Sequence, residues 1–157
     1  MTANTKEKPV AIVTGASSGM GLGITRALLE HRYRVVANSR TISKSKDLKP
    51  SADLVLVDGD IGKKETATKV VEAAVKYFAR IDLLVNNAGI YIPKPFTEYT
   101  PEDFEMMIGT NVAGYFFITQ QGGGANAQTE IWAYREHLYD LNGTAVGRRA
   151  HLTACPH

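Results

Sequence analysis

The sequence predicts an α/β fold in which a parallel, doubly wound sheet lies between two layers of helices. Four short runs of apolar and β-branched residues are expected as strands, at about 9–14, 33–38, 53–57 and 81–86. Stretches with helical spacing of apolar residues alternate with these runs, which indicates parallel pairing and right-handed crossovers. The first run ends in a glycine-rich turn, a second feature typical of sheets of this class that bind anionic ligands.

The helices expected between the strands have recognisable faces and ends. A first helix is expected at about 19–31 and a second at about 65–79, where charged residues fall opposite an apolar stripe. A third is expected at about 101–120, with Thr100 as its N-cap and Pro101 as its first residue. The stripe of the second helix consists of Val70, Val71, Ala74, Val75 and Phe78.

The turn after the first strand has the chemistry of a phosphate site. Gly15, Gly19 and Gly21 follow the spacing G-x-x-x-G-x-G, and glycine permits positive φ and a close approach of ligand to backbone. The helix that begins there adds free N–H groups and a partial positive charge. The spacing differs from G-x-G-x-x-G, a match that Ile24 prevents. A glycine-rich connection that holds no ligand would have the same sequence.

This turn, Thr-Gly-x-x-x-Gly-x-Gly, resembles the cofactor turn of the short-chain dehydrogenases/reductases. Family-like motifs follow at Asp60-Ile61, at Asn86-Asn87-Ala88-Gly89 and at Asn111, so the resemblance covers residues from about 8 to 120. It implies a Rossmann-type domain that binds NAD or NADP, and hydride transfer between that cofactor and a carbonyl or alcohol substrate. The cofactor-binding residues that it implies are Thr14, Gly15, Ser17, Ser18, Gly19, Met20, Gly21, Ser39, Arg40, Asp60, Ile61, Asn87, Ala88 and Gly89.

Two positions bear on the choice of cofactor. An acidic residue about 20 positions past the turn would bind the ribose 2′-hydroxyl of NAD. The sequence has Ser39 there, followed by Arg40, whose guanidinium can make charge-assisted bonds to a 2′-phosphate. We therefore expect NADP to be preferred over NAD. An ordinary solvated arginine after a strand is the alternative.

Polar residues after the third and fourth strands complete the implied site. The resemblance implies that Asp60 accepts from the adenine amino group, although Asp58 competes for this role and a turn aspartate would serve without any ligand. It implies that the asparagines after the fourth strand brace neighbouring strands and that the turn meets the nicotinamide-side ribose. Asn111 matches the family's active-site asparagine, which holds a water in a proton relay; a polar interruption in a helix is the alternative.

The remaining catalytic residues of the family are absent from this sequence. They are a serine after a fifth strand and a Tyr-x-x-x-Lys pair, in which tyrosine is the general acid. Tyr134 is followed four residues later by Leu138, and Tyr139 by Gly143, while no lysine follows Lys94. We therefore expect Asn111 to be the one catalytic residue present and the chain to be inactive.

The resemblance stops near Gln120. We therefore expect an incomplete Rossmann domain at 1–120, followed by a poorly ordered, non-family tail at 121–157. The sheet is expected to end after about four strands, which leaves a bare edge. Three glycines from Gly122 should break the helix, and no apolar strand is expected to follow. A lone amphipathic helix at about 127–141 is expected at most. A shifted reading frame from Gln121 onward would permit a helical continuation and then Gly-His-Ile-Val-Asn-Ile-Ser, which resembles the family's fifth strand and its serine.

Composition excludes several other classes of protein. A net charge of +2 is too small to indicate nucleic-acid or membrane attraction, and no apolar run is long enough to span a bilayer. The single cysteine, Cys155, excludes a disulfide framework, so we expect a cytoplasmic protein, and no metal site is expected. The family implies homo-oligomers for a full-length parent. The rival hypotheses are a non-catalytic nucleotide-binding or interaction module and a non-functional frameshifted product.

Overall fold

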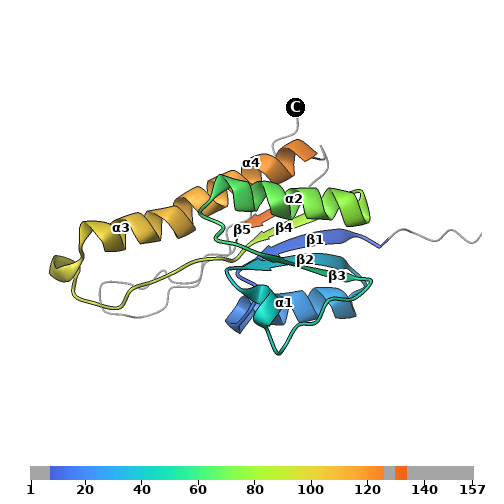
Figure 1. Ribbon diagram of the computed structural model, residues 1–157, viewed down its shortest axis with the longest axis horizontal. Coiled ribbons are helices and arrows are strands. Elements are labelled where there is room, and N and C mark those ends of the chain that lie inside the picture. Colours follow the sequence, from blue (N-terminus) through green and yellow to red (C-terminus); the bar gives the residue numbers. More distant parts are fainter. Residues whose placement is uncertain (1–7, 126–129, 134–157) are drawn as a thin grey trace, which may run out of the picture.

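The computed structural model describes residues 8–125 and 130–133 of the 157-residue chain. Its centre is a five-stranded sheet with every neighbouring pair parallel, in the order β3-β2-β1-β4-β5 (Figure 1). The predicted α/β class and doubly wound parallel sheet are therefore confirmed. The strands are β1 (Val10–Thr14), β2 (Arg34–Ser39), β3 (Leu54–Asp58), β4 (Leu83–Asn86) and β5 (Glu130–Ala133).

Helices cover the two faces of the sheet. Helix α1 lies on one face, and α2 and α4 lie side by side on the other (Figure 1). The long helical segment after β4 has a π-helical middle between α3 and α4. The helical elements are α1 (Gly19–Glu30), η1 (Ile42–Lys44), α2 (Lys64–Phe78), η2 (Phe96–Glu98), α3 (Pro101–Ile108), η3 (Gly109–Gly114) and α4 (Tyr115–Ala125).

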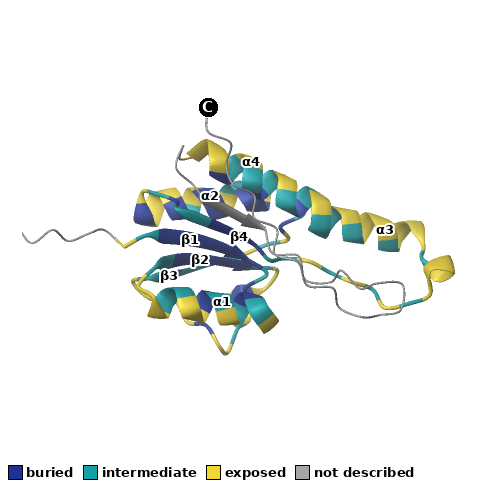
Figure 2. Cartoon of the chain, turned by 180° about the vertical axis from the view of Figure 1, so that it is seen from behind, coloured by how far each residue is buried: buried dark blue, intermediate teal, exposed yellow. Residues whose placement is uncertain are grey.

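The sheet separates two apolar cores. One joins the strands to α2 and α4 and includes Ile12, Leu84 and Ile118, each with no exposed surface. The other joins them to α1 and η1 and includes Val13, Val35 and Ile42. Figure 2 shows the same distribution, with dark blue strands between helices whose outer faces are yellow. Strands buried on both faces explain the continuous apolar runs in the sequence.

The helix faces follow the predicted pattern with one error. Val70, Val71, Ala74 and Phe78 of α2 are buried, as the spacing predicted. The prediction for Val75 is wrong, because this residue is 46% exposed. On the helix it is offset by about 100° from Ala74, which lies within the buried stripe. The predicted cap of α3 is present, because Thr100 and Asp103 form a reciprocal capping box with Pro101 at N1.

The segment after Gln120 departs from the prediction in two ways. Helix α4 continues through Gly122 to Ala125, because Gly122 is buried and packs closely on Leu84 of β4, and tertiary contact overrides the low helix propensity of glycine. A strand does follow, since β5 pairs with β4 from Leu83↔Glu130 to Asn86↔Ala133. The expected bare edge at β4 is therefore covered. The rest of the expected amphipathic helix lies outside the described residues.

Candidate cofactor site at the carboxyl edge of the sheet

The predicted site residues lie where a doubly wound sheet binds its ligands. The chain runs β1, β2, β3 to one side and then returns to place β4 on the other side of β1. The order therefore reverses between β1 and β4, and such switch points form the binding crevice outside the carboxyl ends of the strands. Every strand is parallel, so the turns after β1, β2, β3 and β4 all meet at this edge.

Two glycines of the first turn are required by close packing. A Cβ on Gly15 would lie 2.8 Å from the Cα of Ala88, and Gly15 has φ +65°. A Cβ on Gly21 would lie 2.2 Å from the Gly15 carbonyl oxygen and 2.4 Å from Nδ2 of Asn87. No side chain fits at either position, so the turn after β1 and the turn after β4 lie backbone against backbone at the switch point.

Gly19 differs from these two, because a Cβ there would meet nothing within 4 Å, although its φ is +54°. This positive φ lets the chain enter α1 while leaving open space in front of the helix. The N-cap Ser18 makes no side-chain capping bond. The first-turn amides of α1 therefore have no side-chain acceptor in the part of the chain that the structure describes, and an anionic group fits there.

Thr14 and Asn87 connect the two turns by hydrogen bonds. The buried Thr14 hydroxyl accepts from the backbone N–H groups of Asn87 and Ala88, at 3.1 and 3.0 Å. Asn87 Nδ2 donates in return to the carbonyl oxygens of Thr14 and Gly15, at 3.0 and 3.1 Å. Asn86 donates to the Thr119 hydroxyl of α4 at 3.1 Å. Asn87 therefore braces β1 against the turn after β4, as predicted, whereas Asn86 joins β4 to α4.

The two aspartates after β3 have different environments. Both carboxylate oxygens of Asp58 accept from Ser43, one from the backbone N–H at 2.8 Å and one from the hydroxyl. The Ser43 hydroxyl, more than its N–H, holds the pKa of Asp58 below its usual value. Asp60 accepts from the Gly62 N–H through one oxygen, at 2.9 Å, and its second oxygen has no partner among the described residues. Asp60 thus retains an acceptor that Asp58 lacks.

Ser39 at the end of β2 and Arg40 directly after it are the two residues expected to bear on cofactor choice. Ser39 is half-buried, and its carbonyl accepts from the Gly59 N–H at 3.0 Å. Arg40 is exposed and makes no hydrogen bond or ion pair within residues 8–125 and 130–133. The neighbouring Asn38 is buried and donates to the carbonyls of Val57 and Gly59, which ties β2 to the turn after β3.

Asn111 lies in the π-helical segment η3 and fixes the segment that follows β4. Its Oδ1 accepts from the Ile90 N–H at 2.8 Å and its Nδ2 donates to the Ile90 carbonyl at 2.9 Å. The side-chain amide of Asn111 is therefore committed to the backbone. A π-helical turn inserts an extra residue, which re-aims the side chains and carbonyls around it and is common at functional sites.

The loop between β4 and α3 has its own charged cluster. Lys94 pairs with Asp103, which also accepts from the Thr100 N–H at 2.8 Å. The Lys94 side chain, followed by Thr100, holds the pKa of Asp103 below its usual value. The Tyr99 hydroxyl donates to the Ile92 carbonyl, and desolvation raises the pKa of Tyr99. These bonds hold the loop together and fix it to the start of α3.

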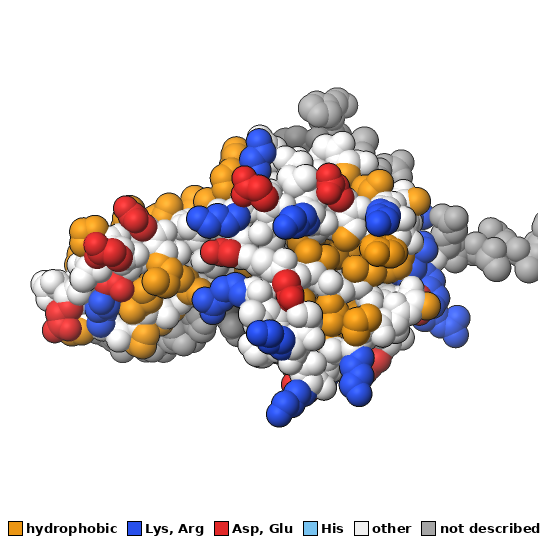
Figure 3. All heavy atoms as spheres, viewed as in Figure 1, with side chains coloured by type: hydrophobic (Ala, Val, Ile, Leu, Met, Phe, Trp, Pro, Cys, Tyr) orange, Lys and Arg blue, Asp and Glu red, His pale blue; other side chains and the backbone are white. Residues whose placement is uncertain are grey.

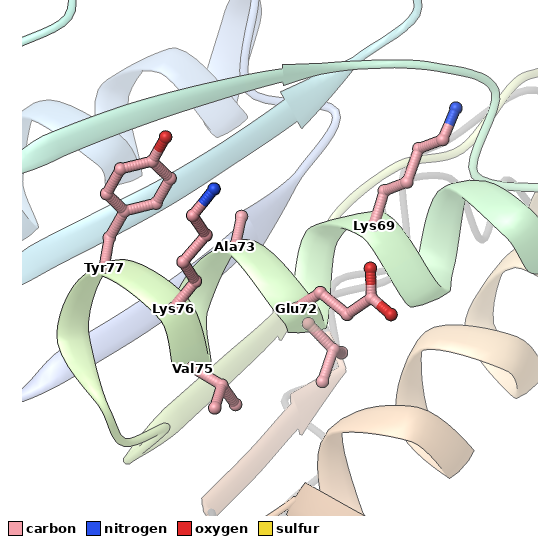
Figure 4. Close-up of a pocket in the computed structure, with 7 residues that line it drawn as sticks. Lys69, Glu72, Ala73, Val75, Lys76 and Tyr77 are labelled. Atoms are coloured by element: carbon pink, nitrogen blue, oxygen red, sulfur yellow. The ribbon is translucent and has the colours of Figure 1, made fainter.

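Among the described residues, two hollows lie outside this edge, one on α2 and one beside the start of β3. The hollow in Figure 4, about 600 Å³, is lined by α2 residues alone, among them Lys69, Val75 and Tyr77, and draws nothing from the strand ends. On the face shown in Figure 3, Lys and Arg side chains are interspersed with Asp and Glu. The described residues contain no group of three or more metal-ligating side chains and no helix that could span a membrane.

A family model for short chain dehydrogenases matches residues 9–123. The chain belongs to the short-chain dehydrogenase family. It is 36% identical over 124 residues to a Streptomyces violaceoruber protein named as a ketoacyl reductase of the granaticin polyketide synthase, covering 76% of this chain and 50% of the relative. The chain thus spans about half the length of the curated relatives that it matches.

Solved structures of the family share this fold. A 3-ketoacyl-(acyl-carrier-protein) reductase from Brucella melitensis, complexed with NADH, has a TM-score of 0.72 and 31% identity over 81% of this chain and 57% of its own. ElxO with NADP bound has a TM-score of 0.73 and 27% identity, over 80% of this chain and 54% of its own. The first of these two proteins therefore carries NADH in its structure, and the second carries NADP.

The dehydrogenase turn, the Asp60-Ile61 pair and the Asn87-Ala88-Gly89 segment are brought to one edge, as the motifs predicted. Ile61 is buried against Gly114 of η3, so it joins the turn after β3 to the helix that contains Asn111. Two residues were missed. Asn38 was overlooked because it reads as a strand residue, and Ser43 because it lies in a polar loop with no motif. A buried polar residue inside an apolar run was the available signal for Asn38.

Proposed function

We propose that this chain binds a nicotinamide dinucleotide across the β1–β4 switch point, with NADP preferred over NAD. The observation that supports this most directly is the uncapped first turn of α1, placed beside two glycines at which no side chain fits. The pyrophosphate would be held by the first-turn amides at Ser17–Gly21. In this proposal the site's other residues, Thr14, Gly15, Ser39, Arg40, Asp60, Ile61, Asn87, Ala88, Gly89 and Asn111, surround the remaining parts of the cofactor.

The roles of these residues follow from their chemistry. The exposed Arg40 guanidinium would make charge-assisted bonds to a ribose 2′-phosphate. The unpartnered oxygen of Asp60 would accept from the adenine amino group. At the other end, Asn87, Ala88 and Gly89 would meet the nicotinamide-side ribose, and Asn111 would hold the Ile90 segment in place beside them.

For a full-length protein that contains this chain, we propose the activity of the longer family members. That activity is hydride transfer between the nicotinamide and a carbonyl or alcohol carbon, and relatives named as ketoacyl reductases favour a ketone substrate. A proton must also pass to or from the substrate oxygen, which a positioned general acid accelerates by about 10²–10⁴-fold. The 157 residues contain no Tyr-x-x-x-Lys pair, so we expect cofactor binding without turnover from this chain.

Titration of the chain with NADPH and NADH, followed by calorimetry or nicotinamide fluorescence, tests the proposed function. Gly19→Asp adds a carboxylate before α1, where a Cβ has open space and aspartate tolerates the positive φ. We expect it to abolish binding without unfolding the chain. Gly23→Asp is the matched control, since Gly23 is exposed on the next turn with nothing within 4 Å. Equal binding by both variants, or cofactor-dependent turnover by the wild-type chain, contradicts the proposal.

The alternatives are separated by the same titration and by the coding DNA. The family match ends at residue 123, beside the change in composition after Gln120. We propose a change of reading frame near codon 121 as its origin. Resequencing would contradict this if neither other frame encodes an apolar strand near codons 133–138. An intact frame together with cofactor binding would favour a non-catalytic nucleotide-binding module.

A further inference from the structure

The short helical turn after β2 is held by an aspartate that the cofactor motif does not use. Ser43 lies in η1, and both its backbone N–H and its hydroxyl donate to Asp58 at the end of β3. Ser39 and Asp58 are opposite each other in the β2–β3 register. The Asp58 carboxylate therefore reaches across from the neighbouring strand end to fix the loop that leaves β2.

This contact restrains the segment that contains Arg40. On one side, Ser39 is the last residue of β2, and its carbonyl accepts from the Gly59 N–H. On the other side, Ile42 is fully buried and Ser43 is bonded to Asp58. Only Arg40 and Thr41 lie between these two anchors. The backbone from which the Arg40 side chain starts is thus fixed, although the side chain itself is exposed.

Loss of the Asp58–Ser43 contact would loosen the segment of Arg40 and Thr41 at its C-terminal end. The bonds of Asp58 are at the surface, so they contribute little to global stability, but they restrict the conformations of Arg40. A side chain that starts from a fixed backbone loses less conformational entropy when its guanidinium binds an anion. This smaller entropy loss strengthens the binding of NADP, which has a 2′-phosphate on the ribose. It does not strengthen the binding of NAD, which has a hydroxyl there.

We propose that the Asp58–Ser43 contact is a specificity-determining device, in which Asp58 acts as a positioning residue for Arg40 and so sets the preference for NADP over NAD. This inference rests on the proposed cofactor function. The competing effect is electrostatic, since a carboxylate near a 2′-phosphate repels it. Asp58 has both oxygens engaged by Ser43, which favours positioning over repulsion.

The test measures the ratio of the dissociation constants of NAD and NADP for variants of the whole chain. Asp58→Ala should lower this ratio by about fivefold through weaker NADP binding, with NAD affected less than about twofold. Ser43→Ala keeps the backbone bond and should give an intermediate ratio. Asp58→Asn retains an acceptor for the Ser43 N–H and should restore most of the preference.

Asp53→Ala is the matched control, because Asp53 is a surface aspartate beside the opposite end of the same strand and pairs with Lys8. It should leave the ratio unchanged. A ratio that rises in Asp58→Ala would show repulsion, and an equal loss for both cofactors would show a merely structural role; either overturns the inference. A wild-type chain that binds neither cofactor overturns the proposed function itself. Binding by the wild type, with a ratio that Asp58→Ala leaves unchanged, overturns only the inference about Asp58.

Discussion

The two halves of the carboxyl edge are held together in different ways. Between β1 and β4 the contacts are backbone against backbone, and they are closed by the Thr14 and Asn87 hydrogen bonds. Between β2 and β3 the turns are held by side chains, namely the buried Asn38 and the surface pair Asp58 and Ser43. At Gly15 and Gly21 the first half has no room for a Cβ. In the second half Arg40, Ser43 and Asp58 are exposed, so these side chains can vary without disturbing the cores. In the proposed function, the rigid β1–β4 half contacts the part that all nicotinamide dinucleotides share. The β2–β3 half contacts the part in which NAD and NADP differ, so its side chains must be able to vary.

Gly21→Ala should have the largest effect on the rigid half. Its Cβ would lie 2.2 Å from the Gly15 carbonyl oxygen of the same turn and 2.4 Å from Nδ2 of Asn87. The turn after β1 must therefore open and move away from Asn87, at a cost of about 3 kcal/mol in the free energy of unfolding. Denaturant unfolding measures this. Gly23→Ala, which meets nothing within 4 Å, should instead stabilise α1 by about 0.5–1 kcal/mol. Similar effects of the two substitutions would show that the close approach of the turns is not important.

Thr14→Val tests the hydrogen bonds of the same half. Valine has a similar shape but leaves the N–H groups of Asn87 and Ala88 without their acceptor, at a cost of about 2 kcal/mol. Thr25→Val is the control, since the Thr25 hydroxyl donates only to the Gly21 carbonyl within the same helix. Unfolding free energies of both variants should differ. If they are equal, Thr14 acts through packing alone.

Arg40→Ala probes the adjustable half. We expect no change in thermal stability, because the side chain is exposed, but weaker NADP binding by about 1–3 kcal/mol through loss of a charge-assisted contact. NAD binding should change much less. Calorimetry with both cofactors checks this, and equal losses would exclude a role for Arg40 at the 2′-phosphate.

Acidification should have the smallest effect, through Asp103 in the loop after β4. The Lys94 side chain and Thr100 lower the pKa of Asp103 from its ordinary value of 3.8. A carboxyl with a lowered folded-state pKa stabilises the fold above its unfolded pKa and loses that contribution as the pH falls through the lower value. Melting temperatures of wild type and Asp103→Asn should therefore converge below about pH 4. A constant difference down to lower pH would contradict this assignment.

The sequence was informative where chemistry and local pattern coincide. The glycine spacing, the strand ends and the Thr100 cap could be read directly, because each follows from local geometry. Val75 and the glycines after Gln121 could not, since the orientation of α2 and the packing of Gly122 on Leu84 are set by distant elements. The different environments of Asp58 and Asp60 likewise depend on Ser43, which lies 15 residues away from Asp58 in the chain.

The π-helical segment η3 divides the long helix after β4 into two parts with separate surroundings. Helix α4 buries Ile118 against the sheet, whereas α3 contains no buried residue and projects beyond the strands (Figure 1). Because a π turn offsets the faces before and after it, α3 need not share the orientation that the core imposes on α4. Helix α4 is therefore fixed by the core, whereas α3 extends from it without such packing. Hydrogen exchange should accordingly be fast in α3 and slow around Ile118.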